Sequence, residues 1–150
     1  MTSSRLDAYC GLYCGSCVLY LATRRGELSK ASVTFGVPAE GLRCDGCRTR
    51  ILAVSCRDCR IRACATAKGR VSCAGCPETP CALLRELQGR LPHLGEIVDN
   101  LQRIATIGAE SWCDEQAARW RCPSCRRPTE WYETTCGSCG TPVPAGYKTK

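Results

Sequence analysis

Cysteine is the residue type in this sequence whose number and spacing could do chemistry. Of the 150 residues 16 are cysteines, and C-x2-C pairs recur at Cys14/Cys17, Cys44/Cys47, Cys56/Cys59, Cys73/Cys76, Cys122/Cys125 and Cys136/Cys139. Two thiolates in such a turn can share one ion, and two turns supply the four ligands of a tetrahedral site. Disulfide bonding predicts no such spacing, and the first residues lack the apolar core of a signal peptide. We therefore expect reduced, metal-ligating cysteines in a cytoplasmic protein.

The last four of these cysteines form the sharpest motif. They make a C-x2-C-x10-C-x2-C pattern from Cys122, Cys125, Cys136 and Cys139. The pattern predicts a zinc ribbon over 122–143, in which a β-hairpin joins two knuckles and one tetrahedral ion closes them. A rubredoxin-like iron fits the same four sulfurs. Because four protein ligands leave no open position on the ion, we assign no catalytic residue here.

Eleven further cysteines precede residue 82, and we predict that they also ligate metal: Cys10, Cys14, Cys17, Cys44, Cys47, Cys56, Cys59, Cys64, Cys73, Cys76 and Cys81. Since eleven is not a multiple of four, the spacing leaves open which of them share an ion. Cys10, Cys14 and Cys17 have the radical-SAM spacing, but the chain is too short for the barrel of roughly 200 residues or more that such an enzyme needs. Zn(II), three to four ions in the whole chain, is the expected cofactor. The alternative is [4Fe–4S] in this N-terminal region.

Two other residues could ligate metal but lack a paired ligand nearby. His93 follows Pro92 at a predicted helix start, and we expect an ordinary surface histidine. Cys113 lies in a helical region without a C-x2-C partner, so we expect a buried free thiol.

The composition explains why metal would matter to this fold. Leu, Ile, Val and Phe together number 26 of the 150 residues, which is too few for a large hydrophobic core. Metal ligation can supply the missing stabilisation. The formal net charge is +7 with neutral cysteines. Each tetrathiolate zinc or [4Fe–4S] centre would subtract two charges, so the basic balance is weak evidence for nucleic acid.

Between the cysteine motifs, apolar periodicity and glycine or proline stops predict short helices. We expect helices from Cys17 to Gly26, within 27–41, over 83–87, over 94–105 and over 111–120, with Trp112 and Trp120 packed on the last of them. Residues 42–81 should form loops and knuckles, with CRDCRIRAC (56–64) and CAGCPETPC (73–81) as a duplicated metal-binding turn.

These elements predict a small metal-stabilised α+β fold, with a cysteine-knuckle region and short helices followed by a two-knuckle β-hairpin zinc ribbon. The expected divisions are a cysteine-rich metal-binding domain at 1–107, a connecting helix at 108–121, the ribbon at 122–143 and a flexible tail at 144–150.

The N-terminal motifs also resemble a known family. CGLYCGSCVLYLAT, RCDGC, CRDCRIRAC and CAGCPETPCALL, in this order over about residues 8–107, resemble the uncharacterised cysteine-rich prokaryotic family "domain of unknown function 3795". The resemblance implies a small cytoplasmic protein that binds metal through the eleven N-terminal cysteines, all of which are present. Some relatives are similar in carrying an additional ribbon with the pattern W-x(n)-RW-CP-x-C. In this sequence the pattern comprises Trp112, Arg119, Trp120, Cys122 and Cys125. The family name offers no activity.

We therefore expect a non-enzymatic metal-binding protein that acts as a structural or interaction module for an unidentified protein partner. A first alternative is an iron–sulfur redox or accessory protein. A second is a nucleic-acid-binding protein whose binding face comprises Arg126, Arg127, Trp131, Tyr132 and Lys148 or Lys150. A single histidine and the lack of a phosphate-binding loop argue against an acid–base enzyme. No apolar run is long enough to cross a membrane, so no membrane partner is expected.

Overall fold

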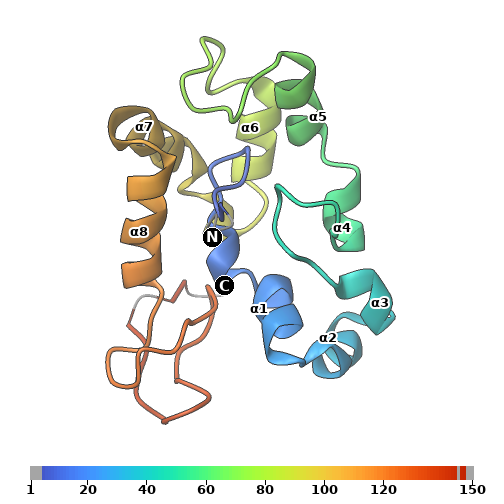
Figure 1. The fold of residues 1–150 in the computed structure, drawn as a ribbon, viewed down its shortest axis with the longest axis vertical. Helices are drawn as coiled ribbons and strands as arrows, with labels where there is room; N and C mark the ends of the chain where they lie inside the picture. The colour runs from blue at the N-terminus through green and yellow to red at the C-terminus, as the bar shows by residue number, and fades with distance from the viewer. Residues whose placement is uncertain (1–4, 145, 148–150) are drawn as a thin grey trace.

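The fold is built from short helices joined by irregular loops. The computed structural model describes residues 5–144 and 146–147. Its α-helices are α1 (Val18–Arg25), α2 (Leu28–Phe35), α3 (Ala39–Leu42), α4 (Val54–Arg57), α5 (Arg60–Ala67), α6 (Ala82–Gln88), α7 (Ile97–Ile107) and α8 (Ala109–Arg119), with 3-10 turns η1 (Cys14–Ser16) and η2 (Pro92–Leu94) (Figure 1). Residues 5–144 contain isolated β-bridges but no strand. The predicted α+β class is therefore wrong, and the described chain is α-helical.

The first three helices follow one another through tight glycine turns. Gly26 and Gly36 close α1 and α2 in the left-handed conformation, with φ of 68° and 65°. A residue with a Cβ pays a steric penalty in that conformation, and glycine does not. Small apolar side chains then meet between the helices at Ala22, Ala31 and Leu42. The predicted helix that ends at Gly26 is confirmed.

The larger core lies between α6, α7 and α8. Leu84, Ile97 and Leu101 are almost completely buried in one cluster, as the periodicity of apolar residues along α7 predicts. Trp112 and Trp120 are buried in a second cluster on and after α8. Their predicted packing against the helices is confirmed.

The N-terminal segment lies at the centre of the molecule, with α7 and α8 on one side and α1 to α4 on the other (Figure 1). It approaches α7 closely at Gly11, where φ is +89° and an added Cβ would lie 2.5 Å from the carbonyl oxygen of Ile97. The Asn100 amide donates a hydrogen bond to the Gly11 carbonyl at 2.9 Å. Asp7 is fully buried and accepts hydrogen bonds from Arg5 and Arg48. These contacts hold the first cysteines against the helices.

Residues 42–81 differ from the prediction of loops and knuckles alone, because they include α4 and α5. The two copies of the C-x2-C-x4-C motif are also not duplicated in structure. The copy at 56–64 runs through α4 and α5, whereas the copy at 73–81 consists of turns that end where α6 begins. Local helix formation therefore separates two segments that share only their cysteine spacing.

The C-terminal segment does not form the predicted β-hairpin, so the ribbon fold assigned to 122–143 is wrong. The backbone of Trp131, at the centre of the segment, forms hydrogen bonds with residues outside the expected hairpin. Its N–H donates to the Ser16 carbonyl at 3.2 Å, and its carbonyl accepts from the Tyr147 N–H at 2.6 Å. Its indole is buried, with 7% exposure. Contacts with the helical body thus replace strand pairing in this segment.

Of the residues predicted to form a flexible tail, Tyr147 packs on Trp120 with ring centroids 5.4 Å apart. Residues 145 and 148–150 lie outside the described part of the chain. Within that part, no helix has the length and apolar character needed to cross a membrane.

Candidate metal centre

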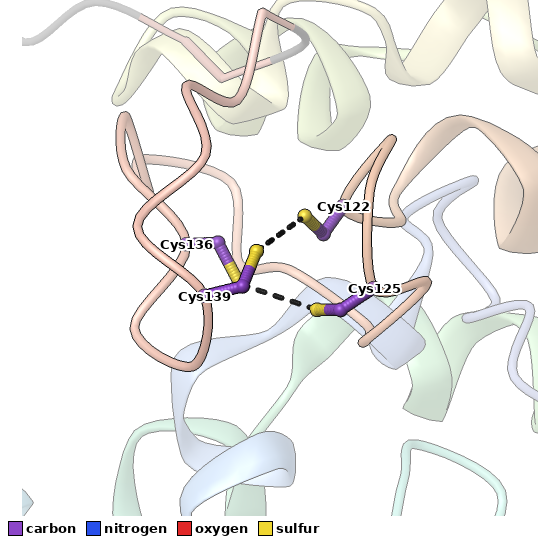
Figure 2. Close-up of side chains that lie close together, drawn as sticks. All are labelled: Cys122, Cys125, Cys136 and Cys139. Atoms are coloured by element: carbon purple, nitrogen blue, oxygen red, sulfur yellow. Dashed lines mark hydrogen bonds between the residues drawn. The ribbon is translucent and has the colours of Figure 1, made fainter.

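Four sulfur atoms converge at the C-terminal end of the molecule. Cys122 and Cys125 come from the loop after α8, and Cys136 and Cys139 come from the next loop (Figure 2). Sγ atoms are 3.5 Å apart in the pair Cys122–Cys139 and 3.6 Å apart in the pair Cys125–Cys136. All four ligand atoms lie within 4.8 Å of one another.

These separations fit a single metal ion and exclude disulfides. A disulfide needs an S–S bond of about 2.05 Å, and all 16 cysteines are free thiols. Four sulfurs at about 2.3 Å from one zinc ion stand about 3.8 Å apart in a regular tetrahedron. The observed sulfur separations need only small adjustments to reach that geometry. The four cysteines could therefore hold one metal ion.

The two loops are built alike, although they do not pair with each other as strands. In the first, the Cys122 N–H donates to the Arg127 carbonyl at 2.8 Å, and an isolated bridge joins Arg121 to Pro128. In the second, the Cys136 N–H donates to the Thr141 carbonyl at 2.9 Å, and an isolated bridge joins Thr135 to Pro142. Each C-x2-C turn is thus closed by its own short loop.

Both loops place the residue after the second cysteine in the left-handed conformation. Gly140 fills this position in the second loop with φ of 75°, but Arg126 fills it in the first with φ of 67°. Each of these residues donates its N–H to the carbonyl of the first cysteine of its pair, at 3.0 Å for Arg126 and 2.9 Å for Gly140. A side chain at such a position costs conformational energy, so the first loop carries a strain that the second avoids.

Hydrogen bonds prepare two of the sulfurs to bind as thiolates. The Thr141 hydroxyl lies 3.1 Å from the Cys139 sulfur, and with the Thr141 N–H it lowers the pKa of Cys139 to about 6. The N–H groups of Cys139 and Ser138 lower the pKa of Cys136. Because metal binds the deprotonated sulfur, these donors favour metal binding at neutral pH.

Glu133 connects the two loops and was missed from the sequence. Its carboxylate accepts from Arg127 Nη1 at 3.1 Å and from the Gly137 N–H at 3.0 Å, and also from the Glu130 N–H at 3.1 Å. Its side chain is only 12% exposed. No spacing signal marks a single glutamate in the segment between two C-x2-C motifs, so only the structure identifies it.

An aromatic cluster fixes this segment to the helical body. The rings of His93 and Trp131 are stacked at 4.1 Å with an interplanar angle of 8°. His93 Nδ1 and the Tyr132 hydroxyl share a hydrogen bond of 2.7 Å. The expectation of an ordinary surface histidine is wrong: His93 is partly buried, and burial lowers its pKa to about 4. Because Trp131 is buried in this stack, its ring face is not open for stacking on a base.

The structure describes two of the remaining residues of the predicted nucleic-acid-binding face, Arg126 and Arg127. Arg127 is paired with Glu133, whereas Arg126 is exposed. Lys148 and Lys150 lie outside the described residues.

We divide the eleven N-terminal cysteines into two groups, which are not separate, since Cys10 interacts electrostatically with Cys14 and Cys47 of the first group and with Cys59 and Cys73 of the second. The first, which we call the loop cluster, comprises Cys14, Cys17, Cys44, Cys47 and Cys56. Cys44 and Cys56 are close enough to Cys17, and Cys47 is close enough to Cys14, to interact with them electrostatically. Burial raises the pKa of Cys17 to about 11 and that of Cys14 well above its usual value. These thiols therefore stay protonated unless a cation compensates their charge.

The second group, which we call the core-edge cluster, comprises Cys10, Cys59, Cys64, Cys73, Cys76 and Cys81. Four of its members, Cys10, Cys59, Cys73 and Cys81, pack against the apolar cluster of α5, α6 and α7. The other two, Cys64 and Cys76, interact electrostatically with Cys73. The Cys73 N–H donates to the Tyr9 carbonyl at 2.9 Å, which joins the turn before α6 to the N-terminal segment.

The sulfurs of these two groups are more widely spaced than those of the C-terminal site. Within residues 5–144 and 146–147, the four C-terminal cysteines are the only group of three or more possible ligands whose atoms lie within 4.8 Å of one another. Cys113 belongs to none of these groups. It is half-buried beside the tryptophan cluster, and the N–H groups of Leu6 and Asp7 donate to its sulfur.

Comparison with known proteins identifies the family but no activity. No curated protein and no solved structure matches the chain. The model of a family described as "Protein of unknown function (DUF3795)" matches residues 6–86, which include all eleven N-terminal cysteines and exclude the C-terminal four. Since the match spans more than half of the sequence, the chain belongs to this DUF3795 family of proteins of unknown function.

Proposed function

We propose that the C-terminal cysteines bind one structural Zn(II) ion, and that the ion fixes the C-terminal segment against the helical body. The observation that carries this proposal is the convergence of the four Sγ atoms from Cys122, Cys125, Cys136 and Cys139 within 4.8 Å. Four thiolates complete the tetrahedral coordination that structural zinc prefers. The proposed role is structural, because four protein ligands leave the ion no position for a substrate.

The lack of regular secondary structure between the two cysteine pairs supports a structural role for the ion. The chain from Cys122 to Cys139 forms no helix or strand, and its backbone hydrogen bonds close single turns or make isolated contacts with other segments. Binding of zinc to four thiolates contributes about 10–16 kcal/mol in small zinc domains at neutral pH. One such ion therefore offsets a large part of the backbone conformational entropy, roughly 1–2 kcal/mol per residue, that this segment loses on folding.

The position of the segment supports a role in anchoring. Trp131 lies between the two cysteine pairs and is buried among side chains of the helical body. The Arg25 guanidinium of α1 donates to the Pro128 carbonyl beside the first loop. The ion would hold both loops in the shape that presents Trp131 to His93. We therefore propose a metal-binding structural module that stabilises the interface between the C-terminal segment and the family domain.

The test compares zinc content and docking in two single variants of the full chain. Cys122→Ser should lose about one zinc per chain relative to wild type, because three thiolates hold the ion far less tightly than four. Tryptophan fluorescence should shift to the red as Trp131 becomes exposed. Cys113→Ser is the matched control, since Cys113 is a free thiol outside the site, and it should keep both properties. If Cys122→Ser retains full zinc content and a buried tryptophan signal, the proposal is wrong.

A further inference from the structure

The positive charge of the chain is concentrated in residues 43–70, which we call the basic segment. This segment holds eight of the 21 Lys and Arg residues but only two of the 14 Asp and Glu residues. Its formal charge is +6, whereas the rest of the chain carries only +1. The segment includes α4 and α5, which lie on the side of the molecule away from α7 and α8 (Figure 1). One side of the molecule is therefore strongly basic.

Three arginines of the basic segment surround a surface hollow beside α5. The hollow has a volume of about 620 Å³ and is lined by Arg57, Arg60 and Arg62 together with small side chains of α5. Arg57 and Arg60 are exposed, and Arg62 is partly buried. The hollow therefore presents several guanidinium groups to one bound molecule.

Hydrogen bonds to main-chain carbonyls hold two of these arginines in place. Arg62 Nη2 donates to the carbonyls of Cys56 and Arg57, at 2.9 and 2.8 Å. Arg57 Nε donates to the Leu52 carbonyl at 3.1 Å. A carbonyl orients a guanidinium group without neutralising its charge, so both arginines are positioned and keep their full positive charge.

Carboxylates do not neutralise these three arginines. In the described part of the chain, no Asp or Glu oxygen lies within 4 Å of a side-chain nitrogen of Arg57, Arg60 or Arg62. Asp58 is the one carboxylate among the residues that line the hollow. Other basic residues of the segment are paired with acids: Arg43 with Asp45, Arg48 with Asp7, and Lys68 with Glu78. The hollow thus keeps a net positive charge.

The neighbouring cysteine does not share the outward position of these arginines. Cys59 precedes α5 and packs against the apolar cluster of α5, α6 and α7. Arg57 and Arg60, on either side of it in sequence, are exposed. Their side chains are therefore accessible to a partner from solution.

The composition of the basic segment favours the phosphate groups of a nucleic acid duplex. Seven of its eight basic residues are arginines, and the planar guanidinium group binds phosphate through two parallel hydrogen bonds. The segment contains no Trp, Tyr or Phe, so it offers no ring on which an unpaired base could stack. Contacts of this kind hold the backbone and do not read the base sequence.

The same segment is poorly suited to a membrane surface. A helix that lies on a membrane buries a broad apolar face in the lipid. The one large apolar side chain of α5, Ile61, is buried in the protein with 7% exposure. Ile51 and Val54 are exposed near α4, but neither lines the hollow.

We propose that the basic segment binds the phosphate backbone of a nucleic acid duplex, with Arg57, Arg60 and Arg62 as the contacting residues. This activity uses a surface that is separate from the C-terminal zinc site and independent of it. The test measures fluorescence anisotropy of a labelled duplex of about 20 base pairs during titration with the full, metal-loaded chain. DNA and RNA duplexes are used, and binding to either supports the proposal.

The salt dependence of binding reports the number of phosphate contacts. Three contacts predict a slope of about −2.7 for the logarithm of the DNA association constant against the logarithm of salt concentration. The affinity should then fall about 40-fold between about 50 and 200 mM KCl. The double variant Arg57→Gln/Arg60→Gln should have a slope of about −1 and lose only about three- to fourfold over the same range. Asp58→Asn should bind more tightly than wild type, because it removes a repelling charge.

The matched control is the double variant Arg90→Gln/Arg103→Gln. It removes the same charge from two exposed arginines outside the basic segment, and it should keep the wild-type slope. Circular dichroism and zinc content, measured for every variant, should be unchanged.

Four outcomes overturn the proposal. The first is a wild-type chain that binds neither duplex at about 50 mM KCl, a result that does not depend on the folding of any variant. The second is a wild-type slope in Arg57→Gln/Arg60→Gln. The third is an equal loss of slope in the control variant, which would mean that only the overall charge matters. The fourth is binding to vesicles of phosphatidylcholine and phosphatidylserine with none to a duplex, which would make the basic segment a membrane-binding surface.

Discussion

The stack of His93 on Trp131 makes the stability of the protein depend on pH in a way that one substitution removes. Burial lowers the pKa of His93 from 6.5 to about 4 in the folded chain. The unfolded chain therefore takes up this proton near pH 6.5, whereas the folded chain takes it up only near pH 4. Between these values the unfolded state binds more protons, so stability falls as the pH falls. Above about pH 7 the group has no effect.

The size of the effect follows from the two pKa values. The full shift corresponds to a loss of about 2 kcal/mol in the free energy of unfolding between pH 7 and pH 5. Because His93 is only partly buried, solvent screening reduces this to about 1 kcal/mol. The variant His93→Phe keeps an aromatic ring on Trp131 and cannot take up a proton, so it should lack this contribution.

The assay is urea unfolding of metal-loaded wild type and His93→Phe at pH 7, 6 and 5, followed by tryptophan fluorescence. Thiolate protonation weakens metal binding in both proteins alike, so the difference between them isolates the histidine. We expect wild type to lose about 1 kcal/mol more than the variant between pH 7 and pH 5. Equal losses in the two proteins would refute the link between His93 burial and docking of the C-terminal segment.

Three further predictions concern single residues of the fold and the site, each measured by urea unfolding at pH 7. Gly140→Ala should lower the free energy of unfolding by about 1 kcal/mol, and Arg126→Gly should raise it by up to about 1 kcal/mol. Both effects are expected because the two residues have the left-handed backbone conformation. Effects of the same sign in the two variants would contradict the equivalence of the two loops. Gly11→Ala should cost about 2 kcal/mol or more, since its Cβ would meet the Ile97 carbonyl; a neutral effect would mean that the segment is not held there. Glu133→Gln should cost about 1–3 kcal/mol, because the Arg127 and Gly137 donors lose a charged acceptor, and unchanged stability would remove Glu133 as a connector.

Much of the helical part could be predicted from the sequence because its signals are local. The glycine after α1 and the apolar period of α7 act within a few residues, and both helices form where expected. The tryptophans at Trp112 and Trp120 lie at near-helical spacing and are buried. By contrast, α5 has few large apolar residues, and its start uses a cysteine as N-cap, with the Arg62 N–H donating to the Cys59 sulfur at 3.4 Å. Sequence rules for helix starts do not include cysteine as an N-cap, so the start of α5 could not be predicted.

The error over the C-terminal hairpin has a tertiary origin. The segment between the cysteine pairs is rich in residues that favour strands, and local preference alone predicts a strand. Contacts with Ser16, His93 and Tyr147, which are distant in sequence, override that preference. The spacing of Cys122, Cys125, Cys136 and Cys139 identified residues that the fold brings together, but not the backbone that carries them. The grouping of the N-terminal cysteines required the structure, because similar spacing occurs in both clusters.

X-ray absorption at the zinc edge of the purified full chain tests the C-terminal centre most directly. The proposed site predicts a zinc environment of sulfur alone, with Zn–S distances of about 2.3 Å. Nitrogen or oxygen atoms in the zinc coordination shell, or a chain that binds no zinc under reducing conditions, would contradict it.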